Sequence, residues 1–208
     1  MLAEELETPG WLFLMSMPSV CVFCGSSSAV PDIYFGAARE TGRALAALGW
    51  SVVYGGARNG LMGALANSAL KAGGRVIGVI PRGLVEREVA HAGLTELHVV
   101  DTLQERKLMM AELSDAFLTL PGGFGTLDEL FEVLTWAMLG LHEKPCVIVN
   151  TQGFYDELLA FTRRAGEAGF VSEESCRRLL VVAEPQSALQ LISERLGGDF
   201  SPQHSLLK

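Results

Sequence analysis

Short apolar runs alternate with amphipathic segments along most of this chain. The apolar runs are four to six residues long, and several are apolar on both faces, as in strands of a parallel sheet that helices cover. The segments between them repeat their apolar residues with the period of a helix. This alternation over the length of one domain predicts an α/β fold built on an open, doubly wound parallel sheet with helices on both faces.

The expected elements can be given by residue number. The predicted strands cover residues 20–24, 51–54, 75–80, 97–100, 116–120, 146–149 and, with a weaker pattern, 180–183. The predicted helices cover residues 32–48, 61–72, 102–113, 126–139, 154–168 and 187–196.

Length and composition indicate one domain. The chain has 208 residues, of which 49% are apolar and 19% charged, a composition typical of a compact globular protein. We expect a single domain over residues 18–197. We expect a poorly ordered extension before it (1–17) and a tail after it (198–208).

The charge distribution argues against two classes of partner. The formal net charge is −8 and no basic cluster stands out, so we expect no nucleic-acid surface. No apolar run reaches the length of a membrane span, and acidic residues precede the short apolar run at 11–17, unlike the basic start of a signal peptide. We therefore expect no membrane association.

The cysteines and histidines do not suggest a metal or redox site. Cys21 and Cys24 form a Cys-x-x-Cys, but they fall in a predicted strand, where positions three apart point to opposite faces. Buried, reduced thiols are the better interpretation, which favours a cytoplasmic location. The four histidines lack metal-ligand spacing. We expect neither a metal nor a cofactor.

Glycines and small hydroxyl residues follow several predicted strands. They occur at residues 24–28, 54–57, 81–83 and 121–123. In open α/β sheets, ligands bind outside the carboxyl ends of the strands, at the point where the strand order reverses. Several such turns at one edge of a sheet predict a shared site of nucleotide size.

The most informative of these turns reads Pro-Gly-Gly-Phe-Gly-Thr-Leu-Asp-Glu over residues 121–129. Its glycines, Gly122, Gly123 and Gly125, allow backbone N–H groups to approach a ligand closely. The turn leads into a helix N-terminus, which favours anions. With Glu129 one turn into the helix, the run predicts chemistry on a phosphorylated small molecule.

A purely structural interpretation of the same run remains open. Thr126 and Glu129 fit a capping box, with Thr126 as the N-cap and Glu129 at position N3. In that case Glu129 would stabilise the start of its helix and have no chemical role.

Arg106 is the second candidate for chemistry. In the predicted helix at 102–113 it lies in the middle of the apolar stripe, so it should be buried. A buried guanidinium needs a partner, which could be an internal carboxylate or an anionic ligand. Lys107 is turned about 100° away and is expected at the rim.

These motifs identify a resemblance. The chain resembles the LOG ("lonely guy") family of cytokinin riboside 5′-monophosphate phosphoribohydrolases. The signature Pro-Gly-Gly-x-Gly-Thr-x-x-Glu is matched at residues 121–129, and an Arg-Lys pair ahead of it at Arg106 and Lys107. The resemblance extends from about residue 18 to residue 170. The older description of that family as lysine decarboxylases finds no support in the lysines of this sequence.

The resemblance implies a Rossmann-like fold, a homodimer and hydrolysis of the N-glycosidic bond of an AMP-like nucleoside 5′-monophosphate. Carried over residue by residue, it makes Arg106 and Glu129 the catalytic pair and Glu88 a third candidate near the ribose. The residues expected to bind substrate or its phosphate are Gly25, Ser26, Gly55, Gly56, Lys107, Gly122, Gly123, Gly125 and Thr126.

Two other functions compete with this one. The chain could be a general AMP nucleosidase, or a nucleotide-binding or carrier protein without turnover. The pairing of Arg106 with Glu129 favours an enzyme, since a carrier needs no such pair. The sequence also departs from many relatives, which have Tyr at the position of Phe124 and Gln at that of Met138. These changes would affect base recognition or the dimer contact more than cleavage.

Overall fold

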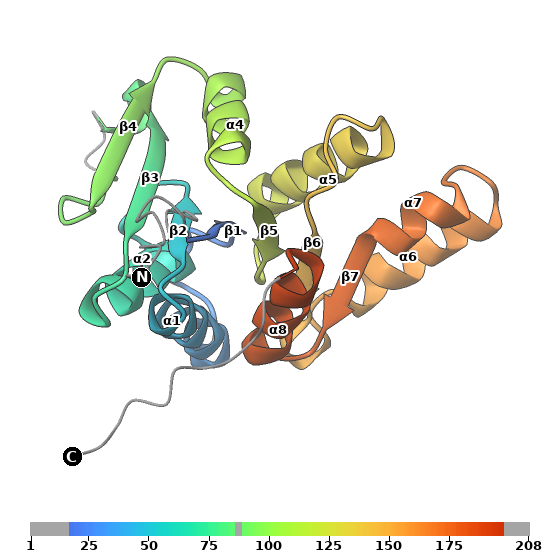
Figure 1. Cartoon of the computed structure of the whole chain (residues 1–208), viewed down its shortest axis with the longest axis horizontal. Coiled ribbons are helices and arrows are strands. Elements are labelled where there is room, and N and C mark those ends of the chain that lie inside the picture. The colour runs from blue at the N-terminus through green and yellow to red at the C-terminus, as the bar shows by residue number, and fades with distance from the viewer. Residues whose placement is uncertain (1–16, 86–88, 198–208) are drawn as a thin grey trace, which may run out of the picture.

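The computed structural model describes residues 17–85 and 89–197. In this part of the chain seven parallel strands form one sheet in the order β4-β3-β2-β1-β5-β6-β7 (Figure 1). The strands are β1 (Ser19–Phe23), β2 (Ser51–Tyr54), β3 (Val76–Pro81), β4 (Glu96–Val100), β5 (Ala116–Thr119), β6 (Cys146–Val149) and β7 (Leu179–Val182).

Helices cover both faces of the sheet (Figure 1). The helical elements are α1 (Asp32–Ala47), α2 (Gly60–Lys71), α3 (Arg82–Val85), α4 (Leu103–Glu112), α5 (Phe124–Met138), η1 (Thr151–Gly153), α6 (Asp156–Glu167), α7 (Glu173–Arg178) and α8 (Pro185–Arg195). Apolar side chains of α1, α2 and α8 form the core on one face, and those of α4 and α5 the core on the other.

The predicted fold class is confirmed. All seven predicted strands and all six predicted helices are present, and no predicted end differs from the observed one by more than two residues. The short helices α3 and α7 were not predicted, because segments of four and six residues are too short to display a helical period. The predicted N-terminal extension, apart from its last residue, and the predicted tail lie outside the described residues.

The strand order reverses between β1 and β5. Register pairs Phe23 with Thr119, so the loops that follow these two strands begin side by side. The backbone N–H of Gly25 donates to the carbonyl oxygen of Pro121 at 3.1 Å and joins the two loops. The two most glycine-rich turns of the sequence therefore meet at the switch point, where open α/β folds bind their ligands.

The cysteines behave as expected from their spacing. Cys21 packs in the core on one face of the sheet and Cys24 in the core on the other, and both are free thiols. Burial raises the pKa of both thiols well above the ordinary value, which makes them poor nucleophiles.

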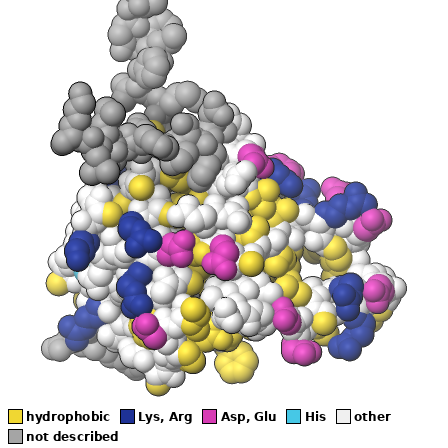
Figure 2. All heavy atoms as spheres, turned by 90° about the horizontal axis from the view of Figure 1, so that it is seen from below, with side chains coloured by type: hydrophobic (Ala, Val, Ile, Leu, Met, Phe, Trp, Pro, Cys, Tyr) yellow, Lys and Arg dark blue, Asp and Glu magenta, His cyan; other side chains and the backbone are white. Residues whose placement is uncertain are grey.

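The described surface carries charged side chains of both signs (Figure 2). On the face shown in Figure 2, the described basic and acidic side chains are interspersed. No helix within the described ranges is long and apolar enough to cross a membrane.

Candidate functional site

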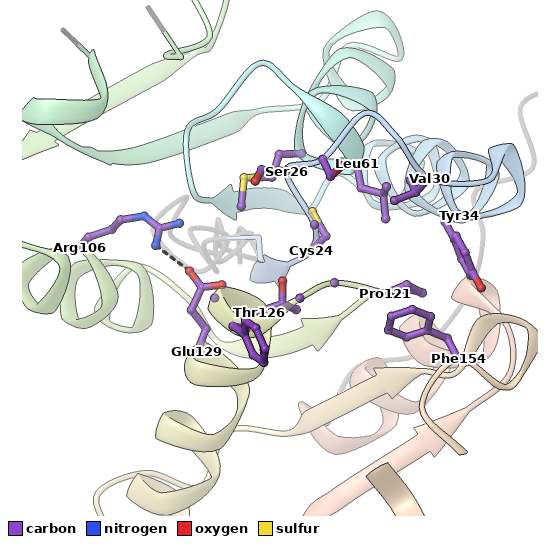
Figure 3. Close-up of a pocket in the computed structure, with 17 residues that line it drawn as sticks. Cys24, Ser26, Val30, Tyr34, Leu61, Arg106, Pro121, Thr126, Glu129 and Phe154 are labelled. Atoms are coloured by element: carbon purple, nitrogen blue, oxygen red, sulfur yellow. Dashed lines mark hydrogen bonds and ion pairs between the residues drawn. The ribbon is translucent and has the colours of Figure 1, made fainter. Parts of the chain in front are cut away.

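A cavity of about 480 Å³ lies at the switch point (Figure 3). Its walls are the loop after β1, the first residues of α2, the loop after β5 and the start of α5. Arg106 and Glu129 lie at one end of this cavity, and Tyr34 and Phe154 lie at the other (Figure 3). The volume falls in the range of pockets that bind small molecules and cofactors.

Arg106 and Glu129 form a buried ion pair. The Nη1 of Arg106 donates to Oε1 of Glu129 at 2.7 Å, and the two residues are only 9% and 4% exposed. The Nε of Arg106 donates to the backbone oxygen of Val79 at 3.1 Å, at the end of β3. The predicted burial of Arg106 is confirmed. Of the two partners that the sequence left open, an internal carboxylate or an anionic ligand, the structure has the carboxylate, and it is the candidate catalytic residue Glu129.

The buried position of Glu129 shifts the pKa of its carboxyl group upward. Burial raises the pKa of its carboxyl group, and the charge and hydrogen bond of Arg106 oppose that rise. Within the described residues, Oε2 of Glu129 accepts no hydrogen bond, and the residue lines the cavity. A carboxylate with a raised pKa and one free oxygen is suited to work on a bound ligand.

The capping-box interpretation is wrong. Helix α5 begins at Phe124 with Gly123 as its N-cap, so Thr126 is the third helical residue and Glu129 the sixth. Glu129 is one turn too far along to reach the N-cap, and it bonds Arg106 instead. The pattern misled because the three preceding glycines were assigned to the loop, whereas Gly125 is already helical.

The start of α5 is open to an anion. No side chain caps this helix, and the first backbone N–H groups of a helix lack partners within it. A Cβ added at Gly123 or Gly125 would meet nothing within 4 Å, so a ligand can approach the backbone there. By contrast, a Cβ at Gly122 would lie 2.1 Å from Oγ1 of Thr126, so this glycine is needed for packing.

A second helix N-terminus at the cavity is already occupied by the protein. The N–H groups of Leu61 and Met62, at the start of α2, donate to the backbone oxygen of Gly25, and that of Gly60 donates to Oγ of Ser28. Of these two helix N-termini, the start of α5 is the one that no described side chain caps. Ser26 lines the cavity opposite it (Figure 3).

Three predicted binding residues lie apart from the cavity lining. Gly55 packs against the guanidinium of Arg106, and Gly56, with φ +75°, packs against Ile80. The ammonium of Lys107 lies 3.0 Å from both Asp128 and Glu132, outside the cavity. Glu88 lies outside the described residues. The structure thus brings together Gly25, Ser26, Arg106, Gly122, Gly123, Gly125, Thr126 and Glu129.

Sequence reasoning missed the far end of the cavity. Tyr34 on α1 and Phe154 after η1 make an edge-to-face contact with ring centroids 5.4 Å apart, and both line the cavity. Phe154 follows the carboxyl end of β6. Because ligands bind outside the carboxyl ends of the strands in such sheets, its position in the sequence could have marked it as a candidate. Tyr34 is in a helix, where no local signal marks it. Within the described ranges, no three His, Cys, Asp or Glu residues could hold a metal together.

Comparison with known proteins identifies clear relatives. Residues 62–192 match the family model described as "Possible lysine decarboxylase". The chain is 49% identical to a cytokinin riboside 5′-monophosphate phosphoribohydrolase of Rhodococcoides fascians, over 84% of this chain and 88% of that protein. It is 43% identical to an Arabidopsis thaliana protein of the same name, over 89% of this chain and 84% of that protein.

Solved structures share the fold at lower identity. A molybdenum cofactor binding protein from Rippkaea orientalis matches with a TM-score of 0.69 at 22% identity, covering 88% of this chain and 99% of that one. The molybdenum cofactor carrier protein of Chlamydomonas reinhardtii matches with a TM-score of 0.68 at 23% identity, covering 87% and 99%. At these identities the likeness concerns the fold.

Proposed function

This chain belongs to the family of cytokinin riboside 5′-monophosphate phosphoribohydrolases, and we propose that it hydrolyses the N-glycosidic bond of a cytokinin-type purine nucleoside 5′-monophosphate. Water and the nucleotide give the free base and ribose 5-phosphate. The observation that carries the proposal is the buried pair of Arg106 and Glu129 in the same cavity as the uncapped start of α5.

The phosphate binds at the start of α5. The N–H groups of Phe124, Gly125 and Thr126 and the dipole of the helix favour an anion there. The hydroxyl of Ser26 lies on the opposite wall and can donate to the same phosphate. This anchoring fixes the ribose with respect to the catalytic pair, so the reaction gains from orientation.

Glu129 acts at the glycosidic bond. Cleavage passes through a state with positive charge on the sugar, which a nearby carboxylate stabilises. Oε1 is held by Arg106, so Oε2 is the oxygen that faces the reacting carbon or the attacking water. Arg106 has further N–H donors beyond the two that the protein uses, and these can bind the departing base or the phosphate. Glu88 is our third candidate for a contact near the ribose.

The test is incubation of the purified protein with AMP and with isopentenyladenosine monophosphate, followed by detection of free base. We expect base release, faster from the isopentenyl substrate. Equal or faster release from AMP would make the chain a general AMP nucleosidase. Release from neither nucleotide, together with tight binding of either, would favour a carrier.

We also propose a homodimer in the cytoplasm. The outer surface of α5 carries exposed apolar side chains, with Phe124 94%, Phe131 37% and Met138 49% exposed. An apolar helix surface of this kind is suited to a second copy of the chain. Cys21, Cys24 and Cys146 are buried free thiols, which suit a reducing compartment.

A further inference from the structure

The side chain of Arg106 crosses the carboxyl ends of two strands before it reaches Glu129. Its Nε bonds the backbone oxygen of Val79 on β3, and its Nη1 bonds Glu129. Its Nη2 lies against Gly55, directly after β2. A Cβ added at Gly55 would be 2.1 Å from Nη2 and 3.2 Å from Cζ of Arg106.

The nearest atoms that a Cβ at Gly55 would meet are the ends of movable side chains. Its three nearest neighbours are Nη2 and Cζ of Arg106 and, at 3.1 Å, the terminal methyl group of Met62. The φ of Gly55 is not positive, so its backbone conformation is one that alanine adopts without strain. Neither the backbone nor the fold therefore requires glycine at this position.

Gly56 provides the contrast. It has a φ of +75°, and a Cβ there would lie 3.0 Å from Cβ of Ile80, in the core. Gly56 is therefore explained by the fold, whereas at Gly55 the severe contact of an added side chain would be with the guanidinium of Arg106.

We propose that Gly55 is a positioning residue: the space left by its missing side chain fixes the guanidinium of Arg106 where it holds Glu129. This inference rests on the proposed function for its effect on turnover, but the geometry exists without substrate. A side chain at position 55 would displace the guanidinium by about 1 Å or more. A misplacement of that size can cost about 100-fold in rate.

The first test is a double-mutant cycle with Gly55→Ala and Arg106→Lys. Lysine has no Nη2, so alanine at position 55 has nothing to displace in that background. We expect Gly55→Ala to lower kcat about 100-fold in the wild-type background and less than about 3-fold in the Arg106→Lys background. KM should change little, and the melting temperature should not fall. Equal losses in both backgrounds would overturn the proposal.

The matched control is Gly36→Ala on α1. A Cβ at Gly36 would meet nothing within 4 Å, and the φ of Gly36 is not positive. This variant should keep the wild-type kcat, which shows that a methyl group at a tolerant glycine has no general effect.

The second test does not need turnover. The carboxyl carbon of Glu129 is titrated by NMR in the wild type and in Gly55→Ala. Arg106 lowers the pKa of Glu129 against the effect of burial, so moving the guanidinium should raise that pKa further. An unchanged titration midpoint would overturn the proposal. If the wild type released no base, the proposed function would fail and this titration would still decide the role of Gly55.

Discussion

Arg106 and Glu129 are 23 positions apart in sequence and meet at 2.7 Å across the space between α4 and α5. Both helices cover the same face of the sheet, and both residues are largely buried. A buried ion pair contributes little net stability, because desolvation of the two charges offsets their attraction. A pair that lines a cavity is therefore better explained by what it does to a ligand than by what it adds to the fold.

The first prediction is that Glu129→Gln lowers kcat by about 100-fold to 10,000-fold, the range of a general acid–base or charge-stabilising carboxylate. Glutamine keeps an oxygen that can accept the hydrogen bond of Arg106, so the fold should be retained. The measurement is steady-state release of base from AMP, with circular dichroism of both proteins.

The neighbouring carboxylates of α5 give a control for Glu129. Glu132→Gln removes one negative charge from the same helix, but Glu132 pairs with Lys107 outside the cavity. We expect this variant to turn over like the wild type. Loss of activity in Glu132→Gln equal to that in Glu129→Gln would show a general effect of charge on α5 and would contradict the assignment.

The second prediction concerns pH. Burial raises the pKa of Glu129 above the ordinary value of 4.5. If the ionised form stabilises the positive sugar, kcat must rise with pH as Glu129 loses its proton, and the midpoint of that rise must lie above pH 4.5. Bound substrate excludes further water from the cavity, so the pKa of Glu129 stays raised in the complex with substrate. Measuring kcat at saturating AMP avoids titration of the free substrate; a kcat that stays constant down to pH 4.5 would contradict this role.

The sequence predicted the sheet, because strands that are buried on both faces and helices with an apolar stripe leave clear periods. It also predicted that Arg106 is buried, because the period of a helix places this residue among the apolar side chains that face the core. The start of α5 was misplaced because glycine has no side chain whose pattern marks a helical turn, and Gly125 proved to be helical. The partners of Lys107 were missed because they depend on how α4 packs against α5, which local periodicity does not contain.

The third prediction tests the anion site at the start of α5. Alanine at Gly123 or Gly125 meets no protein atom within 4 Å, so it should not disturb the fold. Its methyl group would occupy space beside the N–H groups that bind phosphate. We expect KM for AMP to rise about 10-fold, or about 1.4 kcal/mol, with kcat nearly unchanged. Gly83→Ala, at another open glycine, is the control. A fall in kcat at constant KM would place the phosphate elsewhere.

The fourth prediction tests the dimer. A stable interface buries about 800 Å² on each partner and has an apolar centre, which a charge disrupts. Phe131 is 37% exposed on the outer surface of α5, so Phe131→Asp should convert a dimer of the 22.3 kDa chain into a monomer without unfolding it. Light scattering after size-exclusion chromatography measures this mass. Phe161→Asp, at a 54% exposed aromatic residue on α6, adds the same charge on a different helix and should leave the dimer intact. Dissociation by Phe161→Asp alone would move the interface from α5 to α6, and a wild-type monomer would exclude the dimer.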